Sequence, residues 1–217
     1  MTRHGFRMLA ALLLPGTLAA QDAMPDDWTY RLEADQTLST IQAGEDGGWS
    51  YTRMPPGWHI TTTAQGVTLL PKEHTVEGRW GVEAEVFLFP NPSASPFGVV
   101  LEAADAPAPG SVQLQFLVRR DGQAALVARH NGEPEMIAPW TADTAATVHK
   151  GGVVKYVLRV MHEQGHLIFS VNGREMVVQP TGGEDHRAIP GLRVGPGLNL
   201  HVGRFELITP LAPARAR

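Results

Sequence analysis

The chain has 217 residues, no cysteine, and a formal net charge of −4 from 18 basic and 22 acidic side chains. This length is enough for one sizeable domain with an ordinary core, and the lack of cysteine excludes disulfide and thiol chemistry. Nucleic acid and anionic membrane surfaces both require clustered Lys and Arg, so the acidic balance argues against either as the main partner.

The first twenty residues have the pattern of a removable export signal. A positive start with Arg3 and Arg7 precedes an apolar run over residues 8–14, and Ala19-Ala20 precedes a predicted cut before Gln21. The run is about half the length of a membrane-spanning helix, which predicts cleavage without membrane insertion. Cleavage removes two basic residues and no acidic ones, leaving 16 basic and 22 acidic side chains and a charge of about −6. We therefore predict a periplasmic or secreted protein.

The predicted organisation has four parts along the chain. A signal peptide over 1–20 is followed by a lead-in segment over 21–44. One β-sandwich domain is expected over 45–209, with a disordered tail over 210–217. The chain contains no fixed-period repeat and no sign of a second domain.

Apolar and polar residues alternate along much of the mature chain, as expected for strands with one face on a core. Val82, Ala84 and Val86, for example, alternate with Glu83 and Glu85. Comparable segments occur at 112–118, 124–130, 154–160, 167–171, 175–178 and 198–208.

Three dipeptides between these segments suit tight hairpin turns, because Gly, Asn and Asp tolerate positive φ angles. They are Asp121-Gly122, Asn131-Gly132 and Asn172-Gly173. The first two predict a three-stranded meander. About a dozen strands at this spacing predict an all-β fold of two packed antiparallel sheets.

Three of these segments resemble concanavalin A-like, laminin-G-like jelly rolls. They are 116–123, containing Arg119-Arg120-Asp121-Gly122, then 156–173, ending Phe169-Ser170-Val171-Asn172-Gly173, and 191–202. The resemblance covers about residues 45–209 and implies a two-sheet antiparallel jelly roll. Lectins, glycanases and bacterial exported proteins share the pattern, so the resemblance leaves the function open.

The segment His162-Glu163-Gln164-Gly165-His166 matches the H-E-x-x-H pattern of zinc proteases. That pattern requires a helix, which places both histidines on one side of the metal. Strand alternation enters the segment from 154–160 and leaves it at 167–171. We therefore predict a solvated hairpin tip, no metal and no cofactor. A zinc hydrolase using His162 and His166 is the lesser alternative.

Glu83 and Glu85 share one strand face, about 7 Å apart because each residue rises roughly 3.3 Å. Paired carboxylates perform glycoside hydrolysis in sandwich glycanases. A further carboxylate expected on such a strand is absent, because Phe87, Leu88 and Phe89 follow. A glycoside hydrolase-like enzyme using Glu83 and Glu85 is thus an alternative function.

A mixed set of polar side chains is expected to point away from the core. Their forked donors and acceptors suit sugar hydroxyls, and Trp80 or Trp140 could stack on a sugar ring. This interpretation assumes that the strands lie together in one sheet. We expect an exported, non-catalytic module that binds a glycan or another cell-surface ligand, and a purely structural role is the remaining alternative. The predicted ligand-binding residues are Glu83, Glu85, Gln113, Gln115, Arg119, Arg129, Asn199 and His201.

Overall fold

Seventeen strands, all paired antiparallel, account for the regular structure of the described residues in a computed structural model. The described residues are 28–33, 39–40, 44–46, 48–72, 74–142, 147–148, 151–183 and 185–208. The predicted signal over 1–20 and the predicted tail over 210–217 lie outside them. Within the described ranges no helix occurs, and hence no helix that could cross a membrane.

Eight strands form the first sheet, here called sheet A. Their order across the sheet differs from their order in the chain, because β16 and β6 lie between β8 and β1. The strands, in spatial order, are β11 (Glu133–Ala142), β10 (Gln123–His130), β9 (Val112–Val118), β8 (Phe97–Ala103), β16 (Ala188–Val194), β6 (Val67–Pro71), β1 (Trp28–Leu32) and β2 (Ser39–Thr40).

The other nine strands form sheet B. Its centre is the pair β7 and β17, with β13 on the other side of β7. The strands, in spatial order, are β15 (Arg174–Pro180), β14 (His166–Val171), β13 (Val154–Glu163), β7 (Trp80–Leu88), β17 (Asn199–Ile208), β5 (Trp58–Thr62), β4 (Trp49–Arg53) and β3 (Gly44–Asp46), with β12 (Thr147–Val148) also paired to β13.

The core lies between the sheets and is built by one side of each long strand. Val82, Ala84 and Val86 of β7 are fully buried, as the alternation predicts. Phe116 of β9 contacts Phe169 of β14, with ring centroids 5.2 Å apart, and so joins sheet A to sheet B. The predicted all-β sandwich of two antiparallel sheets is confirmed.

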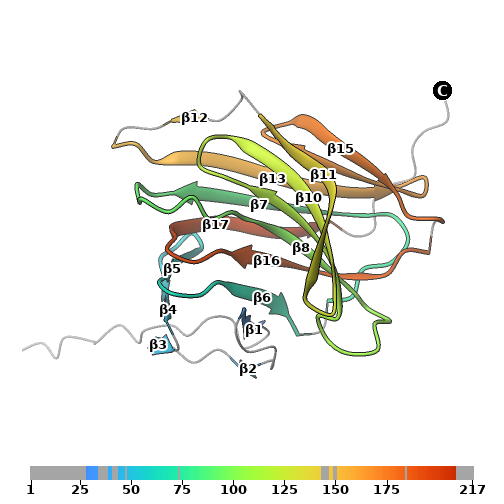
Figure 1. Cartoon of the computed structure of the whole chain (residues 1–217), viewed down its shortest axis with the longest axis horizontal. Helices are drawn as coiled ribbons and strands as arrows, with labels where there is room; N and C mark the ends of the chain where they lie inside the picture. The colour runs from blue at the N-terminus through green and yellow to red at the C-terminus, as the bar shows by residue number, and fades with distance from the viewer. Residues whose placement is uncertain are drawn as a thin grey trace, which may run out of the picture.

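Sheet A begins with the predicted meander and is strongly twisted. Strands β9, β10 and β11 are neighbours, and Gly122 and Asn131 have φ angles of 80° and 51° at the two turns. Figure 1 shows β10 and β11 running steeply across the view while β16 and β6 run almost horizontally.

Part of the predicted lead-in segment belongs to the sandwich. Strand β1 pairs with β6 over its full length, from Trp28 opposite Pro71 to Leu32 opposite Val67. Its Trp28 and Tyr30 are buried in the core. The sandwich therefore takes in residues well before position 45, because burying two aromatic rings stabilises this strand on the sheet.

Candidate functional site

The predicted ligand-binding residues lie on opposite outer faces of the sandwich. The assumption that their strands share one sheet is wrong, because consecutive strands β7 and β8 belong to different sheets. Sheet A carries Gln113, Gln115 and Arg129, with Arg119 just after β9. Sheet B carries Glu83, Glu85, Asn199 and His201. These two groups of side chains therefore face away from each other across the core.

A chain of hydrogen bonds joins buried polar side chains on the outer face of sheet A. Gln115 Nε2 donates to Gln113 Oε1 at 2.7 Å, and Gln113 Nε2 donates to Glu102 Oε1 at 3.0 Å. Arg31 forms an ion pair with the same carboxylate. These four residues are only 2 to 6 % exposed. Because each hydrogen bond fixes the next side chain, the row is held in one arrangement.

Glycines let the long side chains of this face lie across the sheet. A Cβ on Gly98 would lie 1.9 Å from the Phe116 carbonyl oxygen, and one on Gly191 would lie 2.3 Å from that of Leu69. The strands are therefore too close at these points for any side chain. Gly110, in the loop after β8, has φ +73°, and a Cβ there would lie 2.5 Å from Arg31 Cζ. This loop accordingly covers the Arg31 guanidinium.

A second ion pair lies beside the first on this face. Arg193 pairs with Glu33, and both Arg193 and Arg31 stand opposite Thr68 in the strand register. Burial lowers the pKa of Arg193, Glu33 opposes that change, and the nearby positive charge of Arg129 lowers the pKa further.

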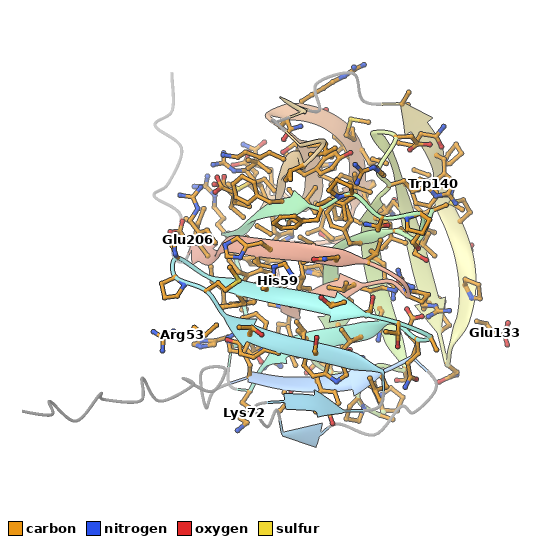
Figure 2. The ribbon with its side chains drawn as sticks, turned by 90° about the vertical axis from the view of Figure 1, so that its left-hand side faces the viewer. Arg53, His59, Lys72, Glu133, Trp140 and Glu206 are labelled. Carbon is orange, nitrogen blue, oxygen red and sulfur yellow. The ribbon has the colours of Figure 1, made fainter. Side chains whose placement is uncertain are left out.

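The two tryptophans proposed for sugar stacking differ in position. Trp80 is fully buried in the core, so the prediction that it stacks on a ligand is wrong. Trp140 of β11 is partly exposed, and the Arg119 guanidinium carbon lies 3.7 Å from its ring centroid. This cation–π contact occupies one face of the indole. Figure 2 shows Trp140 on the opposite side of the molecule from Glu206 of β17.

The two glutamates on the outer face of sheet B form ion pairs with side chains of neighbouring strands. Glu83 forms ion pairs with Arg159 of β13 and Arg204 of β17, and Lys155 Nζ lies 2.7 Å from Glu85 Oε2. Both carboxylates thus hold neighbouring strands together. This arrangement does not favour glycoside hydrolysis by Glu83 and Glu85, because an acid–nucleophile pair must be available to the substrate.

The H-E-x-x-H segment is a β-hairpin, as predicted. Glu163 is paired with His166, and Gln164 and Gly165 turn the chain with φ angles of 52° and 69°. The two histidines lie in different environments, because His162 is fully buried against Trp80 whereas His166 is exposed. The zinc alternative is therefore not supported, and the described residues contain no group of three potential metal ligands. The predicted solvated tip is wrong for His162, whose ring contacts Gly78 and Thr181.

A half-buried imidazole, His186, lies beside His162 and should make stability depend on pH. The His186 ring centroid is 5.4 Å from that of His162 and 6.2 Å from that of Trp80. Burial and the neighbouring His162 both lower the pKa of His186. The unfolded chain therefore takes up this proton first as pH falls, and the folded state loses stability below about pH 6.5. Urea denaturation at pH 7 and pH 5 should show this loss, and His186→Asn should reduce it. An equal loss in the variant would contradict this origin.

Sequence reasoning missed three residues of the outer face of sheet A. Glu102 and Arg193 lie within otherwise apolar strands, and Arg31 lies in the predicted lead-in segment. The signal for the first two was a single charged residue at an outward position of an apolar strand. Such a residue requires a partner, and the partner is far away in the chain.

Comparisons with known proteins show a shared fold at low sequence identity. No family model matches this chain, and neither does any curated protein. The carbohydrate-binding module CBM66 from Bacillus subtilis has TM-score 0.56 and 14% identity, covering 75% of this chain and 96% of the module.

Two further structures match over most of their length. A protein of unknown function with a galectin-like fold, also from Bacillus subtilis, has TM-score 0.58 and 12% identity, covering 84% of this chain and 89% of its own. The VIP36 exoplasmic/lumenal domain, bound to Ca²⁺ and Man3GlcNAc, has TM-score 0.51 and 13% identity, covering 87% of this chain and 88% of that domain. The chain therefore has the concanavalin A-like jelly-roll fold that these galectin-like, lectin and carbohydrate-binding domains adopt.

Proposed function

We propose that this protein is an exported, non-catalytic module that binds a glycan on the outer face of sheet A. The observation that carries the proposal is the hydrogen-bonded row from Gln115 through Gln113 to Glu102 and Arg31. The row lies on the outer side of sheet A, outside the hydrophobic core, and its buried side chains fix the shape of that face. CBM66 and the VIP36 domain, which share the fold, are a carbohydrate-binding module and a glycan-bound domain, which supports the proposal.

The chemistry of the row fits recognition of hydroxyl groups. Amide, carboxylate and guanidinium groups provide donors and acceptors at fixed positions, as sugar hydroxyls require. A side chain already held by its neighbours loses little conformational entropy when a ligand binds. In this proposal the buried row positions the face, and the more exposed Arg129 meets the ligand. Arg119 and Trp140 form a second contact point near the opposite end of β10.

A glycan array and calorimetric titration test this function. Matched arginine variants on the two outer faces identify the binding surface: Arg129→Ala on sheet A and Arg159→Ala on sheet B. We expect Arg129→Ala to weaken binding by about tenfold, because it removes a charge-assisted hydrogen bond. Arg159→Ala should leave affinity unchanged. The reverse result would assign binding to sheet B, and an array without hits would reject glycan binding.

The export part of the proposal rests on residues 1–20 and has its own test. The charged start, short apolar run and Ala19-Ala20 together support cleavage before Gln21. The mature protein recovered from outside the cytoplasm should begin at Gln21, as N-terminal sequencing would show. A chain that retains Met1 in the cytoplasm would contradict export.

A further inference from the structure

Two histidines lie side by side on the outer face of sheet B, away from the surface proposed for the glycan. His59 of β5 and His201 of β17 are directly opposite each other in the strand register, and their ring centroids are 6.4 Å apart. Both side chains are partly exposed. Figure 2 shows His59 on β5, the strand that pairs with β17. Because opposite residues of an antiparallel pair lie on the same side of the sheet, both imidazoles reach the same space above it.

A hydrogen bond leaves one ring nitrogen of His201 available to a ligand. His201 Nε2 lies 2.9 Å from the carbonyl oxygen of Pro56. A carbonyl oxygen only accepts, so in the neutral imidazole Nε2 carries the proton and Nδ1 keeps its lone pair. Histidines that bind a metal through one nitrogen commonly donate to a backbone carbonyl through the other. The contact with Pro56 therefore orients His201 as a metal ligand.

The surroundings of His59 favour its neutral form, which is the form that binds a metal. Burial lowers the pKa of His59 and the nearby His201 lowers it further, whereas the Asn199 side chain opposes the change. Its Nδ1 is buried, which leaves Nε2 as the nitrogen that can meet a metal. The Phe89 ring packs edge-on against the imidazole, with centroids 5.3 Å apart, and limits its movement.

The charged groups beside the histidines offset each other. Phe87 is opposite His201 in the register, and Lys155 Nζ lies 5.4 Å from the centroid of the Phe87 ring. Lys155 Nζ is also 2.7 Å from Glu85 Oε2. A Cβ on Gly203 would lie 3.0 Å from Glu85 Oε1, so this carboxylate lies over the strand that carries His201. The Lys155–Glu85 pair therefore adds no net positive charge that would repel a cation.

We propose that His59 and His201 together bind a transition-metal ion, with Cu²⁺ preferred over Ni²⁺ and Zn²⁺. Imidazole nitrogen suits all three ions, and for a given set of ligands the affinity is highest for Cu²⁺. Two imidazoles on one ion have ring centroids roughly 4.5 to 6.4 Å apart, depending on the N–metal–N angle, because each metal–nitrogen bond is about 2.0 Å long. The observed 6.4 Å is at the upper end of this range, so a small side-chain rotation brings both nitrogens to the ion. Water completes the coordination.

Copper titration of the tag-free protein, followed by calorimetry and electron paramagnetic resonance, tests the site. The spectrum of the first bound Cu²⁺ should show splitting from two imidazole nitrogens. His59→Gln and His201→Gln should each weaken copper binding by about tenfold or more and leave one coupled nitrogen. Ca²⁺ and Mg²⁺ should not compete, because both prefer oxygen ligands. Tighter binding of Zn²⁺ than of Cu²⁺ would overturn the stated preference.

His166→Gln is the matched control, because His166 is an exposed histidine on β14 of the same sheet. It should leave copper affinity unchanged. Equal losses in all three variants would show binding by scattered surface histidines and would reject the site. Unchanged binding in both His59→Gln and His201→Gln would also reject it. Melting temperatures show whether each variant is folded, and none of these results depends on glycan binding.

Discussion

Replacing Glu102 by leucine is expected to lower the free energy of unfolding by about 3 to 5 kcal/mol. Glu102 is 3 % exposed and accepts from Arg31 and from Gln113 Nε2. The substitution leaves a buried guanidinium without its counter-charge and an amide without its acceptor. Equilibrium urea denaturation measures the loss. A change of less than about 1 kcal/mol would mean that this pair is solvated or dispensable.

An exposed carboxylate provides the matched control for this prediction. Asp105 accepts from Arg187 at 2.8 Å, but its side chain is 71 % exposed. Asp105→Ala should cost less than about 1 kcal/mol, because water replaces the lost partner. The double variant Arg31→Met/Glu102→Leu should be more stable than Glu102→Leu, because it removes the unpaired charge as well. If the double variant is the less stable of the two, desolvation is not the cause.

Gly98→Ala is expected to destabilise the protein by about 3 kcal/mol or more, or to prevent folding. The added Cβ would lie 1.9 Å from the Phe116 carbonyl oxygen, a backbone atom that no rotamer change can move. Strands β8 and β9 would have to separate beside the hydrogen-bonded row. The variant should therefore also lose ligand binding, even under conditions in which it is folded. Thermal and urea unfolding measure the first effect, and titration measures the second.

Gly183→Ala separates crowding from the general effect of replacing a glycine. Neither Gly98 nor Gly183 has a positive φ angle, but a Cβ on Gly183 would have no heavy atom within 4 Å. Gly183→Ala should change the free energy of unfolding by less than about 0.5 kcal/mol. Equal effects of the two substitutions would show that the close approach of β8 and β9 does not determine the cost at Gly98.

Alternation in the sequence was sufficient to predict the layers of the fold. The inward residues of β7, β9 and β13 are those that the period of two assigns to the core. The hairpin at His162 was predicted for the same reason, since strand patterns enter and leave it. These predictions succeed because the side of a strand on which a residue lies depends only on its position along that strand.

The candidate site could be predicted only in part, because its residues are distant in the chain. Gln113 and Gln115 were recognised from their own strand, but their partners were not. Arg31 and Glu102 are separated by 71 positions, and nothing local signals their contact. Gly98 has no positive φ angle, so its own backbone conformation does not require glycine. The requirement comes from the close approach of the neighbouring strand β9.

The amino-acid order established that this protein is an all-β chain with one apolar and one polar side to its strands. The distribution of the strands between sheet A and sheet B then divided the polar residues between two opposite faces. On these faces Glu83 pairs with Arg159, and Gln113 donates to Glu102. A period-two pattern specifies which side of its own sheet a residue occupies, but not which strand lies beside it. That neighbour is selected by burial of the whole core, to which every strand contributes at once.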